Sequence, residues 1–177
     1  MKKIITATML LGGLLLSFSS NAQKTEDKSK RPSPPAMEKQ TIKSGATISI
    51  DYSQPSVKGR TIGKDLEPKD GAVWRTGANE ATVFETDKGV TVNGQDLPAG
   101  KYGLFSVVDK DGNWTIIFNK TWNQWGAFKY KEADDQLRVK AKAKKSKTFA
   151  EKMAFTITKK GVVTLWWGDN EVSFKVK

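Results

Sequence analysis

The run WNQW, residues 122–125, places two tryptophans and two side-chain amides next to one another. It falls in an aromatic and polar segment, 119–130, that shows no apolar period, so we expect a long ordered loop there. An indole can stack on the apolar face of a pyranose ring while neighbouring amides bond its hydroxyls. A further indole is expected on the exposed face of a C-terminal strand. The candidate ligand-binding residues are therefore Trp122, Asn123, Gln124, Trp125 and Trp166.

This interpretation depends on which tryptophans are exposed. The sequence contains six, which exceeds what the core of one small domain needs. Successive side chains of a strand leave opposite faces, so Trp167, in phase with Leu165, is expected inside and Trp166 outside. Trp114 alternates in phase with an apolar strand and is expected in the core. The alternative is that the loop tryptophans are buried and plug the open end of the fold.

Polar and aromatic side chains also gather around Gly77. The stretch Ala72–Thr86 is expected to form a strand, a tight polar corner and a second strand. A corner leaves backbone donors and acceptors that strands cannot satisfy, and long polar side chains can reach them. We expect Glu80 to pair with Arg75 or Lys58 there. The corner residues, interpreted as mainly structural, are Trp74, Arg75, Asn79 and Glu80.

One enzymatic hypothesis is compatible with the composition. Glycoside hydrolysis needs only two carboxylates that flank a sugar. Asp51 and Glu80, each on or beside an expected strand, are the best placed for it. A structural ion pair of Glu80 is favoured instead, because ion-pair networks perturb carboxylates as catalytic sites do. We therefore name no catalytic residue.

The sequence contains neither histidine nor cysteine. Their absence excludes Ser-His-Asp and Cys-His catalysis, thiolate redox chemistry and the usual zinc, copper and haem ligation. We expect neither a metal nor a cofactor. Asp109, Asp111 and Asn113 resemble part of a calcium loop, but the later glycine and the distal glutamate are missing, so an ordinary hairpin turn is expected.

The positive charge is carried almost wholly by lysine. The formal net charge is +11, and only four of the 30 basic residues are arginine. Lysine is a hydrated point charge, whereas arginine supplies the forked donors that read phosphates and bases. Nucleic acid is therefore not an expected partner. Attraction to an anionic envelope surface or an acidic glycan is favoured.

The N-terminus has the pattern of a cleavable signal peptide. Met1-Lys2-Lys3 is basic, residues 4–18 are almost wholly apolar, and small residues precede a cut expected after Ala22. Residues 23–37 are charged and proline-rich, which predicts a disordered tether. Without cysteine there is no lipidated cysteine and no disulfide. We expect a periplasmic or secreted protein that does not span the membrane, in an oligomeric state that the sequence leaves open.

From Glu38 onward, short apolar runs alternate with turn signals such as Asn93-Gly94. The run Lys101–Val108 is apolar on both faces and is expected to be a central strand. Thr148 and Glu151 are expected to cap one helical turn. The pattern predicts one all-β domain over residues 38–177, an antiparallel, jelly-roll-like β-sandwich of about nine or ten strands.

Four blocks of the sequence are distinctive: Tyr52–Arg60 (YSQPSVKGR), Val73–Thr82 (VWRTGANEAT), Leu97–Phe105 (LPAGKYGLF) and Gln124–Ala127 (QWGA). They resemble the hallmark blocks of a family of secreted bacterial proteins, the domain-of-unknown-function family 2911. The resemblance runs from about Ser33 to the C-terminus. It implies a compact, exported, β-rich domain, and it brings no activity and no catalytic residues.

The leading hypothesis from the sequence is a weak carbohydrate-binding module for a cell-envelope or extracellular glycan. The first alternative is a structural or protein-interaction domain, in which the same tryptophans are buried or meet a partner. The less favoured alternative is the carboxylate-dependent glycoside hydrolase.

Overall fold

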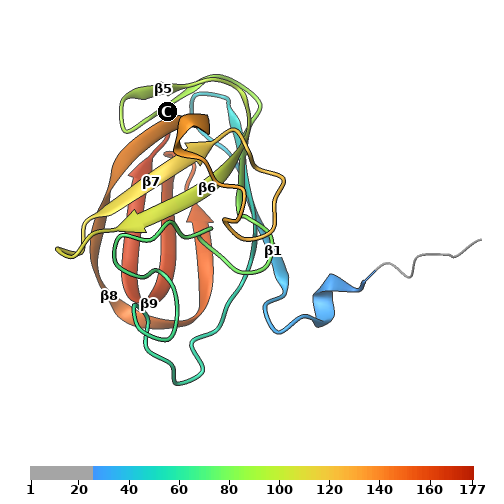
Figure 1. Ribbon diagram of the computed structural model, residues 1–177. Helices are drawn as coiled ribbons and strands as arrows, with labels where there is room; N and C mark the ends of the chain where they lie inside the picture. Colours follow the sequence, from blue (N-terminus) through green and yellow to red (C-terminus); the bar gives the residue numbers. More distant parts are fainter. Residues whose placement is uncertain (1–25) are drawn as a thin grey trace, which may run out of the picture.

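The computed structural model describes residues 26–177, shown as a ribbon in Figure 1. In this part the chain forms nine strands and two short 3-10 helices. The strands are β1 (Pro35–Thr41), β2 (Thr47–Ser53), β3 (Val83–Thr86), β4 (Val90–Val92), β5 (Gln95–Leu97), β6 (Gly100–Val108), β7 (Trp114–Asn119), β8 (Asp135–Ile157) and β9 (Val162–Lys175), and the helices are η1 (Lys28–Lys30) and η2 (Glu132–Asp134). The expected signal peptide and residues 23–25 of the expected tether lie outside the described residues.

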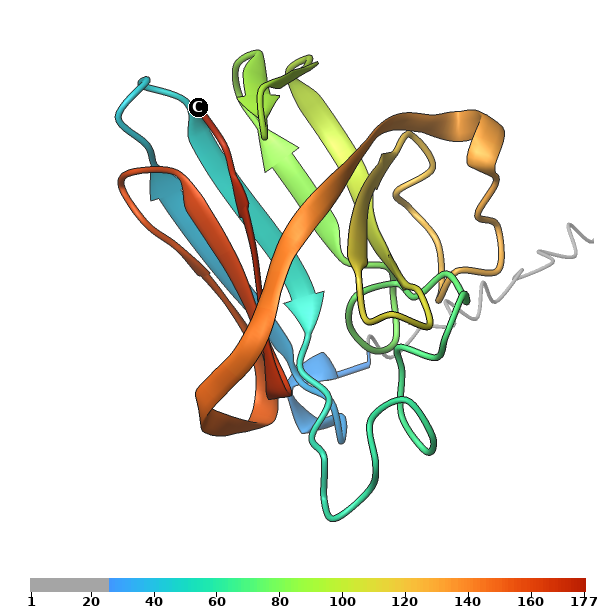
Figure 2. The ribbon, with the colours of Figure 1, turned by 90° about the vertical axis from the view of Figure 1, so that its left-hand side faces the viewer.

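Seven strands form one antiparallel sheet in the order β1-β2-β3-β6-β7-β8-β9, and β4 and β5 form a small hairpin sheet of their own. Figure 2 shows the large sheet curled into two layers that face each other. The expected antiparallel β-sandwich is therefore confirmed. No helix among residues 26–177 is long and apolar enough to cross a membrane.

β8 connects the two layers. Its first part pairs with β7 and the remainder with β9. Register shifts between Lys145 and Ala150 and between Ala150 and Ala154 mark irregular pairing, and such bulges bend a strand. The helical turn expected at Thr148 and Glu151 is wrong, because both residues remain in the extended β8 chain. Cross-strand pairing in this hairpin outweighs a weak local capping signal.

The apolar faces of the two layers enclose the main core. Its members come from every part of the sheet, and they include Ile48, Ile50, Phe84, Leu104, Phe118, Val163, Leu165 and Trp167. Trp114 and Trp167 are buried, with 3% and 1% of their surface exposed, whereas Trp166 is only half-buried. The alternation along these strands therefore predicted the phase of the tryptophans correctly.

β6 is buried on both faces, as its sequence predicts. One face enters the main core. The other carries Phe105, which forms a second cluster with Ala81 and Ile117. Ala127 and Tyr130 pack against this cluster from the loop that follows β7. That loop therefore covers the outer face of β6 and β7 and is held by apolar contacts.

β1 begins before the expected domain boundary at Glu38. Pro35 and Ala36 pair with Ser53 and Tyr52 on β2. The preceding residues, 26–34, include η1 and make polar contacts with the domain. The N-terminal part of the described chain therefore contributes to the candidate site.

Candidate functional site

The corner around Gly77 is fixed by its own hydrogen bonds. The indole N–H of the buried Trp74 donates to the carbonyl oxygen of Gly77 at 3.0 Å, and the Thr82 hydroxyl donates to the carbonyl oxygen of Thr76 at 2.8 Å. Thr76 and Asn79 both have positive φ, which only a tightly constrained turn maintains in residues other than glycine. Two strands were expected around this corner. The first is only an isolated β-bridge at Trp74, and the second is β3.

The corner pairs with the loop at residues 120–130, which we call the aromatic loop. The backbone N–H of Ala81 donates to the carbonyl oxygen of Gln124, and that of Gly126 donates to the carbonyl oxygen of Asn79, both at 2.9 Å. Glu80 and Trp125 form a bridge between these bonds. Two stretches that are 45 residues apart at this bridge (125 minus 80) therefore make one rigid unit.

Two buried amides close the aromatic loop. The side-chain nitrogen of Asn119 donates to the carbonyl oxygen of Lys131 and to the Asp135 carboxylate, while its oxygen accepts from the backbone N–H of Thr121. The Gln124 side chain donates to the carbonyl oxygen of Thr121 at 2.7 Å and accepts from Lys129 at 2.8 Å. The sequence analysis names Gln124 as a ligand-binding candidate, but its side-chain amide forms hydrogen bonds within the loop instead.

Three aromatic side chains of this loop face solvent, and we call them the aromatic surface. Trp122 is 37% exposed, Trp125 is 52% exposed and Phe128 is 84% exposed. The Lys101 ammonium lies 5.5 Å from the ring centre of Trp122, and the Arg31 guanidinium lies 5.7 Å from that of Trp125. Cations at this distance are attracted to an indole face. The expected loop tryptophans are thus exposed, and each has a basic side chain beside it.

The remaining two residues of the candidate set lie in different surroundings. Asn123 is exposed between the two loop tryptophans. Trp166 lies on β9, and its indole N–H donates to the Thr156 hydroxyl on β8 at 3.2 Å. Among the described hydrogen bonds and ring contacts, none connects Trp166 with the aromatic loop. The structure therefore brings Trp122, Asn123 and Trp125 together and leaves Trp166 apart.

Glu80 has partners that differ from those expected. It pairs with Lys28 and Arg31, both at 2.8 Å, and not with Arg75 or Lys58. The reason is that η1 and its flanking residues bring two cations to the corner from a distant part of the sequence. Burial opposes ionisation of Glu80, but the hydrogen bonds from Lys28, from its own backbone and from Arg31 prevail and lower its pKa to about 2.

The Glu80 ion pairs predict how residues 26–34 respond to acid. A pKa lowered from 4.5 stabilises the attached state above pH 4.5, and this contribution is lost as the pH falls towards 2. Since the Glu80 side chain is 39% exposed, salt should also weaken the attachment. We expect acrylamide quenching of tryptophan fluorescence to rise over that pH range, because Arg31 then leaves Trp125.

The substitution Glu80→Gln should raise the quenching already at pH 7 and remove its rise between pH 4.5 and 2. Glu171→Gln is the matched control, since Glu171 pairs with Lys144 at 3.0 Å and the described cation–ring contacts do not include Lys144. Quenching that is unchanged in Glu80→Gln would show that the ion pairs do not hold the N-terminal segment.

Asp51 and Glu80, the carboxylates considered for hydrolysis, line the same small pocket of about 190 Å³. Burial and the charge of Glu85 raise the pKa of Asp51, whereas the pKa of Glu80 is lowered. Such divergence suits an acid and its partner carboxylate. The pocket is nevertheless smaller than the roughly 300–1,000 Å³ usual for ligand sites, and Glu80 is committed to two cations. These features favour the structural role of Glu80.

Arg75 differs from the other arginines in having no partner. Its Nε is fully buried and has no hydrogen bond in the described part of the chain, and none of the ion pairs found there includes its guanidinium. Burial lowers its pKa. A Cβ built on Gly126 would lie 3.6 Å from Nη1 of Arg75 and 3.4 Å from the Phe128 ring, so the guanidinium borders the aromatic loop. No pattern in the sequence indicates this, since it depends on Glu80 being paired with Lys28 and Arg31.

Comparison with known proteins identifies one family. Its model, described as "Protein of unknown function (DUF2911)", matches residues 33–176. No curated protein and no solved structure matches the chain.

Proposed function

We propose that this chain, which belongs to the DUF2911 family of proteins of unknown function, is an exported domain that binds acidic carbohydrate weakly. The observation that supports this best is that the aromatic surface and an unpaired guanidinium belong to the same rigid unit, which the corner and the aromatic loop form together. Trp122, Trp125 and Arg75 contribute the three principal groups. The expected signal peptide would place the domain among envelope and extracellular glycans.

The indoles supply the apolar part of the interaction. Trp122 and Trp125 keep 37% and 52% of their surfaces exposed although each has a cation beside its ring. A pyranose ring can stack on such a surface with little loss of side-chain freedom, because the loop is already fixed by Asn119 and Gln124. Asn123, exposed between the indoles, is the hydrogen-bonding partner for sugar hydroxyls.

The basic groups supply the preference for an acidic sugar. A guanidinium offers a planar fork of donors that fits a carboxylate, and charge-assisted hydrogen bonds of this kind are the strong ones. Arg75 forms no ion pair among the described residues, although the charge of Glu67 acts on it, so its terminal nitrogens Nη1 and Nη2 are the donors for a ligand carboxylate. Lys101 adds a second positive charge beside Trp122. Uronic-acid-containing oligosaccharides combine both required features.

The proposal can be tested by titrating the protein with tetragalacturonate and with a neutral tetrasaccharide of glucose, followed by tryptophan fluorescence and calorimetry. We expect the acidic sugar to bind with a Kd of about 1 mM, equivalent to about −4 kcal/mol. Its affinity should fall as the salt concentration rises. The neutral sugar should bind more weakly still. Trp125→Ala should reduce the affinity at least tenfold, whereas Trp166→Phe is the matched control and should leave it unchanged. No binding, or equal loss in both variants, would refute the assignment.

A protein-interaction function is the second candidate, and one observation favours it. Phe128 is 84% exposed, and exposed apolar groups of this kind gather at protein interfaces. In that case the sugars should produce no spectral shift. The mature protein should then show concentration-dependent or partner-dependent protection of Phe128 and Trp125 from quenching and labelling.

Arg75→Met separates a structural role of this arginine from a binding role. The strong destabilisation expected from an ion pair at the corner should not occur, because the pair does not form. An unpaired buried donor is unfavourable, and methionine keeps the apolar stem without it. We expect an unchanged or slightly raised melting temperature together with loss of tetragalacturonate binding. A melting temperature lowered by more than about 4 °C, equivalent to about 1 kcal/mol or more, would make Arg75 structural.

A further inference from the structure

The N-terminal segment, residues 26–34, crosses the corner beside the aromatic loop. The side-chain nitrogen of Asn79 donates to the carbonyl oxygen of Ser33 at 2.9 Å, and the ion pairs of Glu80 hold the segment one residue further along the corner. Glu80 also forms the bridge with Trp125. These contacts therefore place the segment beside the loop indole with the larger exposed surface.

Arg31 of this segment lies over one face of Trp125. Its guanidinium carbon is 5.7 Å from the centre of the indole ring, and its side chain is only 12% exposed. Two carboxylates fix it there. Nη1 donates to both oxygens of Glu80, at 3.1 and 2.8 Å, and Nε donates to Glu26 at 2.8 Å. A guanidinium and a sugar ring cannot stack on the same face of one indole at the same time.

The charge of Arg31 is already used within the molecule. Glu26 and Glu80 face Arg31 and Lys28, so the two negative and two positive charges of this group sum to zero. An acidic sugar that approached this face of Trp125 would meet both carboxylates and no unpaired cation of the group. The attached segment therefore opposes the binding of an acidic sugar there, through its charges as well as its bulk.

The segment is held much less firmly than the sheet that follows it. Within η1 no residue is buried, and the paired side chains of Lys28 and Glu80 are 55% and 39% exposed. Ion pairs with this exposure contribute little, and parts of a protein with few buried apolar contacts open first. By contrast, β1 pairs with β2 along all seven of its residues. The segment can therefore detach while the sheet stays intact.

We propose that the N-terminal segment is a removable cover that competes with the carbohydrate for Trp125. In the attached state Arg31 occupies one face of the indole, and a sugar stacks on that face only after the segment has left. This inference rests on the proposed function and adds its regulation. The apparent affinity for the sugar equals the intrinsic affinity multiplied by the fraction of molecules in which the segment is detached.

Arg31→Gln tests the cover, because it breaks the attachment and also removes a positive charge. The lost charge alone would weaken the binding of an acidic sugar. We expect the affinity for tetragalacturonate to rise instead, by about threefold or more, since the detached fraction increases. The affinity for the neutral tetrasaccharide of glucose should rise by the same factor, because detachment does not depend on the charge of the ligand.

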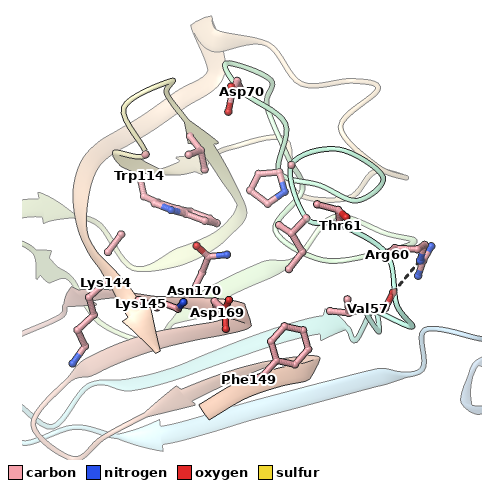
Figure 3. A pocket seen from close by; sticks show the side chains of 16 residues that line it. Val57, Arg60, Thr61, Asp70, Trp114, Lys144, Lys145, Phe149, Asp169 and Asn170 are labelled. Atoms are coloured by element: carbon pink, nitrogen blue, oxygen red, sulfur yellow. Dashed lines mark hydrogen bonds between the residues drawn. The ribbon is translucent and has the colours of Figure 1, made fainter. Parts of the chain in front are cut away.

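The matched control is Arg60→Gln. Arg60 lines a cleft of about 710 Å³ whose described lining includes no residue of the aromatic loop, and it donates to the carbonyl oxygen of Val57 at 3.1 Å (Figure 3). This variant also loses one positive charge and should bind both sugars like the wild type. In a Trp125→Ala background, Arg31→Gln should bring no gain in affinity, which assigns the effect to that indole.

Trypsin cleavage after Lys28 and Lys30, followed by mass spectrometry, reports on the segment itself. Cleavage should be faster in Arg31→Gln. Saturating tetragalacturonate should also accelerate it in the wild type, because sugar binding and detachment are coupled in both directions. Faster cleavage of Arg31→Gln without a gain in affinity, or a gain that persists without Trp125, would overturn the inference and leave the proposed function standing. Absence of sugar binding in both the wild type and Arg31→Gln would refute the proposed function and this inference together.

Discussion

Replacing Phe118 with alanine should lower the free energy of unfolding by about 4–5 kcal/mol, since truncation of a buried phenylalanine leaves a cavity as well as lost apolar contact. Phe118 is completely buried on β7. Its ring contacts three others edge-on, with centres 5.0 Å from Phe84, 6.4 Å from Tyr102 and 5.9 Å from Phe174. These rings come from β3, β6 and β9, so Phe118 ties strands of both layers together, and each aromatic pair adds about 0.5–1.5 kcal/mol.

Chemical denaturation would measure this loss, and an unchanged slope of free energy against denaturant would show that the unfolded state is unaffected. Phe128→Ala is the matched control: the ring is 84% exposed, and its removal should change the free energy by no more than about 0.5 kcal/mol. A loss below about 2 kcal/mol for Phe118→Ala would mean that the core collapses into the vacated space and that the packing described here is not rigid.

Replacing Gly161 with alanine should lower the free energy of unfolding by about 3 kcal/mol or more, through two separate causes. Gly161 has a φ of +77°, a conformation that costs a residue with a Cβ about 1–2 kcal/mol. An added Cβ would also lie 1.9 Å from the backbone oxygen of Val176. That oxygen belongs to the end of the chain that hydrogen-bonds back to Gly161, so it cannot move without breaking the 2.7 Å bond.

The two causes can be separated with Gly112→Ala. Gly112 has the same φ of +77°, but nothing lies within 4 Å of the position its Cβ would take. Its substitution should therefore cost only the conformational part, about 1–2 kcal/mol, and the difference between the two variants measures the collision. If the two variants lose similar amounts of unfolding free energy, in thermal and in chemical unfolding, the C-terminal residues shift freely away from Gly161.

Local sequence patterns predict only part of the candidate site. The sequence predicted that Trp122 and Trp125 lie in a loop, because the stretch between the strands is polar and aperiodic. It left open whether the two indoles are exposed or plug the end of the fold, and the structure shows them exposed. The sequence could not predict that Gln124, between them, turns inward. An amide serves equally well as a ligand contact or as an internal brace, and the choice depends on which backbone groups the closed loop leaves unpaired.

The sequence by itself determined what depends on residue type and on neighbours along the chain. The absence of histidine and cysteine excludes whole classes of chemistry, and the two-residue period of a strand places Trp167 inside and Trp166 outside. Only the tertiary structure decided the rest. Glu80 is paired by cations 49 and 52 residues away, which leaves Arg75 unpartnered. A cleft of about 710 Å³ beside Trp114 is likewise lined by residues that are far apart in the sequence, among them Val57, Trp114, Phe149 and Asn170. Ion pairs and clefts are set by the distance between side chains in space, and sequence separation does not determine that distance.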